Sequence, residues 1–216
     1  MKTDELIDTL SAAPQRRNNG RPLATIALAV FVACLGAFMI SLVWFGLPTN
    51  LADVASTGDH AFFVRIAFSV SVACCAFFVV RDLAVPGRRQ RMPSLVAMAP
   101  FVFLAVLAIH ELSSMSWDEW PAHAGHTSWL TCLWQIIVLA IPAFAVLVVA
   151  MRRLAPTDLR RSGFYVGLLS GSIGAMGYIL HSKDESIVFG AIVYTVAILI
   201  IAAVGALLGP RVLRWS

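Results

Sequence analysis

Six long apolar segments, nearly free of charged residues, constrain the fold more than any other feature of the sequence. They cover residues 23–47, 61–80, 94–109, 129–151, 162–180 and 187–209. An α-helix rises about 1.5 Å per residue, so about 20 apolar residues cross a hydrocarbon core of about 30 Å. Each segment therefore predicts one transmembrane helix. Only 13% of the 216 residues are charged, against about 25% in soluble domains. We expect an all-α polytopic membrane bundle of six transmembrane helices.

The positively charged residues indicate how this bundle is oriented. If the N-terminus is cytoplasmic, all lysine and arginine residues except Arg65 and Lys183 fall on the cytoplasmic side. Because short cytoplasmic loops of membrane proteins are enriched in Lys and Arg, both termini are predicted to lie inside. The predicted divisions are a cytoplasmic tail (1–22), the bundle (23–210) and a cytoplasmic C-terminus (211–216). Arg65, the one charge within a span, is expected to reach the outer surface or to pair with Asp59 or Glu111.

Glycine and proline residues suggest how some of the helices pack. Gly163, Gly167 and Gly171 recur every four residues, so one face of the fifth span lets another backbone approach closely. We expect this face to pack within the chain rather than between two copies. Pro100 and Pro142 lie inside the third and fourth segments, where each is expected to remove a backbone hydrogen bond and allow a kink.

Candidate metal ligands and reactive thiols cluster near the predicted outer ends of the spans. His123, His126, Cys132 and His181 fall there, and imidazole and thiolate are the usual ligands of zinc and softer metals. Solvated loop histidines are a simpler explanation of this pattern, and the identity of any metal stays open. Cys132 is the cysteine expected to reach the oxidising side, where a thiol can respond to oxidants or soft metals. Cys34, Cys74 and Cys75 fall deeper and are expected to be inert.

The first ten residues predict a short amphipathic helix in the cytoplasm. Its apolar face holds Leu6, Ile7 and Leu10, and its acidic residues are Asp4, Glu5 and Asp8. An acidic helix is repelled by anionic lipid, so a protein partner with a basic or apolar groove suits it better than the membrane surface. A frayed tail that merely precedes the first span is the alternative.

Several motifs, in order along the chain, resemble the NrsF family of six-helix inner-membrane anti-sigma factors, which are negative regulators of the extracytoplasmic-function sigma factor SigF. The motifs are the opening MKTDELIDTL, Cys132-Leu133 with Pro142 ten residues later, RRLAPT at 152–157, YILH at 178–181 and GPRVLRW at 209–215. No single motif is specific, but their order and spacing are. The resemblance covers nearly the whole chain.

The resemblance implies a function and a set of site residues. It implies a multi-pass protein of the bacterial inner membrane that holds its sigma factor and releases it under envelope stress by heavy metal or oxidant. The tail residues would bind the sigma factor, with no enzymatic activity, cofactor or direct nucleic-acid contact. Sensing in the family is linked to two cysteines, one matched by Cys132 and the other replaced by Ser182, which follows His181. Three alternatives follow: sensing uses Cys132 alone, with a histidine such as His181 as a co-ligand, or sensing is lost or altered, or Ser182 is an engineered change.

The rival function is a transporter or channel. Six spans containing prolines are compatible with it. However, the spans carry no carboxylate at mid-depth, as ion-coupled transport usually requires. The sequence does not give the oligomeric state.

Overall fold

The computed structural model describes residues 20–47, 60–84, 94–114, 129–154, 156, 158–182 and 187–214. These residues form six α-helices and one short 3₁₀ segment, with no strand among them. The helices are α2 (Gly20–Phe45), α4 (His60–Leu83), α5 (Ala99–Ser114), α7 (Trp129–Arg152), α8 (Leu159–Ile179) and α9 (Ile187–Val212); η1 (Ser94–Met98) precedes α5. Every predicted apolar segment coincides largely with one of these helices, so the predicted all-α fold is confirmed.

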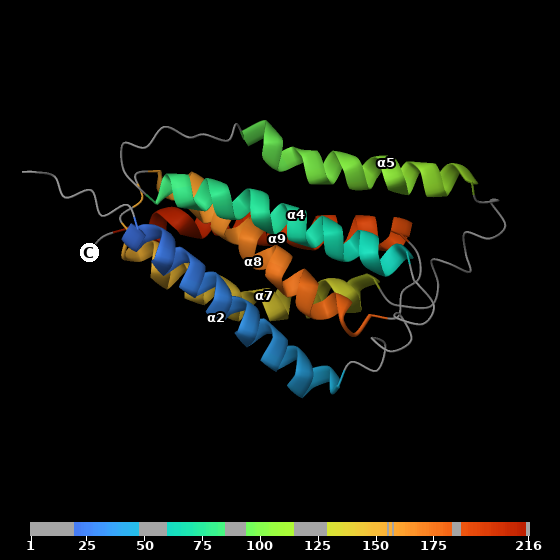
Figure 1. Cartoon of the computed structure of the whole chain (residues 1–216), viewed down its shortest axis with the longest axis horizontal. Helices are drawn as coiled ribbons and strands as arrows, with labels where there is room; N and C mark the ends of the chain where they lie inside the picture. The colour runs from blue at the N-terminus through green and yellow to red at the C-terminus, as the bar shows by residue number, and fades with distance from the viewer. Residues whose placement is uncertain are drawn as a thin grey trace, which may run out of the picture.

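The helices run up and down along one elongated bundle (Figure 1). Successive helices alternate in direction, so the start of α2 and the end of α9 lie at the same end of the bundle. We call the opposite end, where α2 and α8 end and α7 and α9 begin, the distal end. An even number of alternating helices is the arrangement that the prediction of two cytoplasmic termini requires.

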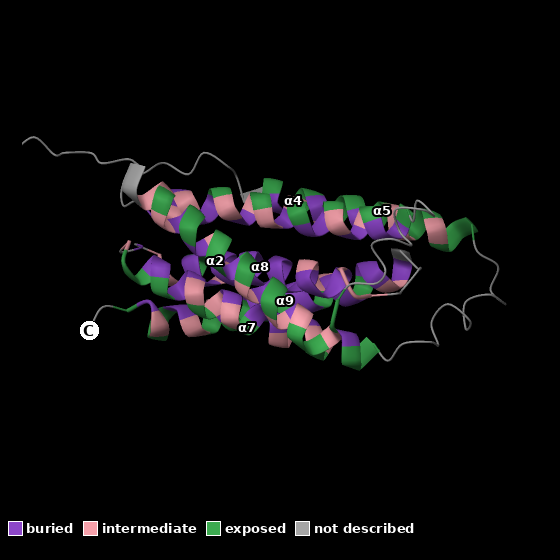
Figure 2. Ribbon diagram, turned by 60° about the horizontal axis from the view of Figure 1, so that its bottom comes forward, coloured by how far each residue is buried: buried purple, intermediate pink, exposed green. Residues whose placement is uncertain are grey.

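The centre of the bundle is α8. It packs against α9, α7 and α4 and also contacts α2, whereas α5 lies at the edge against α9 and α4. Most of the residues of α8 are buried, while the peripheral helices alternate buried and exposed faces (Figure 2). The bundle is therefore organised around its fifth segment.

Five helical segments in the described part of the chain are long and apolar enough to cross a membrane, and α8 is the helix that is not among them. Its composition explains this, because it is rich in glycine and serine. Neighbouring helices shield it from lipid, so it does not need an apolar surface. Two of its buried serine hydroxyl groups are satisfied within the helix: Ser170 donates to the carbonyl of Gly167 at 3.0 Å and Ser172 to that of Leu168 at 2.8 Å.

The glycine face of α8 packs directly on the backbone of α9. A Cβ atom built on Gly167 would lie 2.5 Å from the carbonyl oxygen of Ile201 and 2.7 Å from the Cα of Ala202. Gly163 meets Gly205 and Gly209 of α9 in the same way. The predicted packing of this face within the chain is confirmed.

The two prolines behave differently from each other. Pro142 lies inside α7, as predicted. Pro100 also lies inside its span, which runs from Val96 to Ser114, just after the point where the 3₁₀ segment passes into α5 at Ala99. Pro100 thus occupies the first turn of α5, where a helix has no partner for a backbone N–H and proline is well tolerated.

Arg65 of α4 is almost completely buried, with 2% of its surface exposed. Its Nε donates to the carbonyl oxygen of Ala61, one turn earlier, at 3.0 Å. Gly190 of α9 makes room for its aliphatic stem, because a Cβ there would lie 2.9 Å from the Cδ of Arg65. Asp59, one of its two expected partners, lies outside the described residues.

Candidate functional site at the distal end

Cys132 lies in the first turn of α7, and its side chain is fully buried. The hydroxyl group of Tyr178, on α8, donates a hydrogen bond of 2.9 Å to its Sγ. The thiol predicted to face the oxidising side is therefore covered in this structure and bonded to a neighbouring helix. In this packing the thiol is not accessible to an oxidant or metal ion from solution.

His181 lies directly beyond the end of α8 and contacts the last turn of α2. Its Nε2 is 2.9 Å from the carbonyl oxygen of Gly46, and its Nδ1 is 2.9 Å from the Oγ of Ser41. Since a carbonyl oxygen can only accept, Nε2 carries the hydrogen of the first contact. The imidazole ring also stacks on Phe45, with 5.3 Å between ring centroids and 28° between planes.

The residues at the end of α2 favour these contacts. Gly46 follows the last residue of α2 with a φ of 82°, a left-handed conformation that glycine adopts without steric cost. Its N–H still bonds to the carbonyl oxygen of Leu42 at 2.9 Å. Ser41 is buried, and its hydroxyl donates to the carbonyl oxygen of Gly177 on α8 at 2.7 Å. We call the contacts of His181 with Ser41, Phe45 and Gly46 the His181 clamp.

Tyr178 contacts both Cys132 and Ser182, the two positions that match the cysteine pair of the family. Its hydroxyl contacts Cys132, and its carbonyl oxygen accepts from the backbone N–H of Ser182 at 3.1 Å. Its ring also meets the edge of Phe45, with centroids 6.2 Å apart and planes at 71°. Three helices, α2, α7 and α8, therefore meet around this tyrosine. The sequence reasoning quoted Tyr178 within the YILH motif but gave it no role.

The described residues do not form a metal site in this packing. Among them, no group of three or more His, Cys, Asp or Glu side chains is placed to hold a metal ion. Both ring nitrogens of His181 contact α2, so ligation by His181 would require opening the clamp. His123 and His126 lie outside the described residues. Of the remaining cysteines, Cys34 and Cys74 are exposed on the helix surface and Cys75 is half-buried.

The predicted partner-binding residues also lie outside the described part of the chain, which begins at Gly20. These residues are Asp4, Glu5, Leu6, Ile7, Asp8 and Leu10. Their role stays a prediction. What the structure adds is the position of the helix that follows them: α2 starts at the end of the bundle opposite the clamp (Figure 1).

Nearly the whole chain matches one protein family. The sequence pattern of the family described as "Negative regulator of sigma F" matches residues 10–215. The probable anti-sigma-F factor NrsF of Azospira oryzae is 30% identical over 216 residues, which is the full length of both chains. The anti-sigma-F factor NrsF of Caulobacter vibrioides is 29% identical, again over the full length of both. No solved structure matches this chain.

Proposed function

The chain belongs to the NrsF family of negative regulators of sigma F, and on this basis we propose that it is a membrane-embedded anti-sigma factor. It holds an extracytoplasmic-function sigma factor at the cytoplasmic face of the bacterial inner membrane and releases it under envelope stress. The full-length match to two anti-sigma-F factors is the observation that carries this proposal. The activity is regulatory rather than catalytic.

The apolar helices support the membrane location. Five helical segments of the described chain are long and apolar enough to span a bilayer, and with α8 as the sixth helix the start of α2 and the end of α9 lie at the same end of the bundle. Arg81, Arg152 and Arg211 lie in the last turns of α4, α7 and α9, at that same end. This distribution agrees with a cytoplasmic position of the termini and of the sigma-binding segment.

The tail is the segment we assign to sigma-factor binding. Asp4, Glu5 and Asp8 complement the basic surfaces with which a sigma factor contacts DNA and polymerase, and Leu6, Ile7 and Leu10 offer an apolar stripe for a groove. A bound sigma factor is thereby kept at the membrane, away from RNA polymerase. No cofactor and no direct contact with nucleic acid are needed for this mechanism.

Sensing is assigned to the distal end, with Cys132 as the reactive group. Because the thiol is buried under Tyr178, a soft metal ion or an oxidant reacts preferentially with a packing in which this contact is open. Such an agent shifts the protein toward the open packing by its difference in affinity for the two states. Ser182 supplies no second thiol, so this chain is expected to respond more weakly than a protein with a cysteine pair.

Deletion of residues 1–12 tests the role of the tail. Transcription from promoters of the partner sigma factor should rise, because the binding segment is lost, while the protein stays in the membrane, because no helix is touched. Changing Asp4, Glu5 and Asp8 to lysine should have the same effect, whereas changing the neighbouring Thr3 and Thr9 to alanine should not. Unchanged repression by the deletion variant at normal protein levels would reject the tail as the inhibitory segment.

A further inference from the structure

We propose that His181 positions α2 in its repressing state, and that opening of the His181 clamp carries a change at the distal end to the sigma-binding tail. The inference rests on the proposed function, because the tail acts on the sigma factor and α2 is the helix that continues from it. His181 is thus a coupling residue rather than a metal ligand in the closed packing. Nothing in the sequence alone pairs it with α2.

The clamp concentrates the polar contacts between α2 and α8 at one turn of each helix. His181 reaches Ser41 and Gly46 at 2.9 Å each and stacks on Phe45. The one hydroxyl hydrogen of Ser41 goes to the carbonyl oxygen of Gly177 at 2.7 Å, and this bond is buried. Away from water, such a bond is electrostatically stronger than in solution. The contact of His181 with Ser41 is partly buried, and its contact with Gly46 is exposed.

The rest of the α2 interface is made mostly of small side chains. Its buried positions recur about once per turn, at Ile26, Ala29, Ala33, Ala37 and Ser41, and Ile26 is the large one among them. Small side chains let neighbouring helices approach closely. The spanning window of α2 is 28% buried, against 39% for its main neighbour α7. At the distal end, the position of α2 relative to α8 therefore depends on the clamp.

The clamp is directly connected to the buried thiol. Tyr178 lies one turn before His181 on α8, donates to Cys132 and touches the ring of Phe45. Any repacking that separates Cys132 from Tyr178 disturbs the turn of α8 from which His181 projects. A change at α7 is thus passed to α2 through α8, and opening of the clamp releases the distal end of α2 from α8.

The direct test is to open the clamp without any inducer. His181→Ala and Ser41→Ala should each raise transcription from the partner promoters and reduce the amount of sigma factor that co-purifies with the full-length protein. Each lost hydrogen bond should shift the balance between held and released α2 by about fivefold, which corresponds to ~1 kcal/mol. The matched control is Ser172→Ala, because Ser172 is also a buried serine but donates within its own helix, to Leu168.

A cross-link separates coupling from a general loss of stability. A Cβ on Gly177 would lie 3.6 Å from the carbonyl oxygen of Ala37, so α8 and α2 approach closely there, and a cysteine pair at these two positions is oxidised and its disulfide verified on a non-reducing gel before the binding test. In the His181→Ala protein with Cys34, Cys74 and Cys75 replaced by alanine, the oxidised Ala37→Cys/Gly177→Cys pair should restore binding of the purified sigma factor. Reduction of this cross-link should release it again, which a merely unstable protein would not do.

The outcomes distinguish the clamp from the function on which it rests. If the wild type binds the sigma factor and both His181→Ala and Ser41→Ala bind it equally well, the clamp is overturned and the anti-sigma function stands. If the cross-link fails to restore binding, the clamp is likewise overturned. If the wild type itself binds no sigma factor, the proposed function falls. If the His181→Ala protein is absent from the membrane, sigma-factor binding by the Ser41→Ala protein alone tests the clamp.

Discussion

Tyr178 donates a hydrogen bond of 2.9 Å to the Sγ of Cys132, and this bond joins α8 to α7 at the distal end of the bundle. The acceptor is a fully buried sulfur atom in the first turn of α7. A thiol in this position is protected in the closed packing and becomes reactive when the two helices separate. Its reactivity therefore reports the opening of the bundle.

The first prediction concerns access to this thiol. Tyr178→Phe removes the hydrogen bond but keeps the ring, which should destabilise the α7–α8 contact by about 1 kcal/mol. Labelling of Cys132 by N-ethylmaleimide should be slow in the folded wild type and about fivefold faster in the variant. Mass spectrometry of the peptide that contains Cys132 measures both rates. Tyr165→Phe, on the same helix near its other end, is the control; equal rates in all three proteins would contradict the protective role of Tyr178.

The second prediction concerns the backbone contact between α8 and α9. Gly167→Ala forces a methyl group against the backbone of Ile201 and Ala202 and should cost about 1–3 kcal/mol. Gly36→Ala on α2 meets nothing within 4 Å and should leave stability unchanged or slightly higher. Unfolding of the two variants in mixed detergent and dodecyl sulfate measures the difference. Equal stability would mean that the helices separate at this contact without cost.

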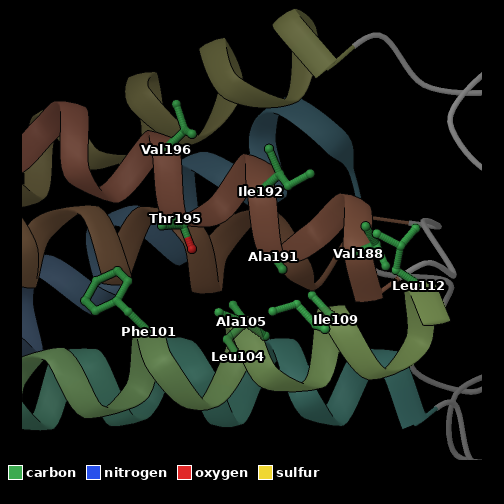
Figure 3. Close-up of a pocket in the computed structure, with 11 residues that line it drawn as sticks. Phe101, Leu104, Ala105, Ile109, Leu112, Val188, Ala191, Ile192, Thr195 and Val196 are labelled. Carbon is green, nitrogen blue, oxygen red and sulfur yellow. The ribbon is translucent and has the colours of Figure 1, made fainter.

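An apolar groove lies between α5 and α9 (Figure 3). It has a volume of about 420 Å³ and is lined by side chains such as Leu104, Ile109 and Ile192, with Thr195 as a polar member. Both helices are apolar and long enough to span a membrane, and the lining is almost entirely apolar. It lies away from the clamp and carries no part of the proposed mechanism.

The third prediction concerns the missing second thiol. Ser182→Cys places a thiol at the position where its backbone N–H already bonds to Tyr178, the residue that covers Cys132. Induction by cadmium ions or diamide in a promoter assay should increase, because two thiols bind a soft metal or form a disulfide where one cannot. A near-complete switch requires about 5.5 kcal/mol of differential affinity, which a paired site supplies more readily than a single thiol.

The control for this third prediction is the double variant. Adding Cys132→Ser to Ser182→Cys should abolish the gain, because the pair is again incomplete. If the wild type, the single variant and the double variant all respond equally, neither position senses the stress.

The sequence predicted the helices well because their signal is local. Apolar length located every segment, and the four-residue spacing of Gly163, Gly167 and Gly171 correctly indicated a close backbone contact. Pro100 lies inside the predicted third span, but the change there from a 3₁₀ segment to an α-helix leaves no signal in hydropathy. α8 is less apolar than the other spans because its neighbours, rather than lipid, surround it.

The contacts of the site could not be predicted in the same way. Cys132 was placed near the distal end from its position in a span, but its burial depends on Tyr178, a residue of another helix. The contact of His181 with Ser41 joins residues 140 positions apart, and no periodicity within either helix indicates it. The tail was assigned from charge and spacing alone and stays a prediction.

The most direct measurement is the affinity of the purified, full-length protein for the purified extracytoplasmic-function sigma factor of the same cell, in detergent or in lipid nanodiscs. The expected result for the wild type is a saturable one-to-one complex. Binding should be lost when residues 1–12 are deleted or when Asp4, Glu5 and Asp8 are changed to lysine. A matched Thr3→Ala/Thr9→Ala variant should bind like the wild type. Absence of a complex with the folded wild-type protein would contradict the assignment of this chain as an anti-sigma factor.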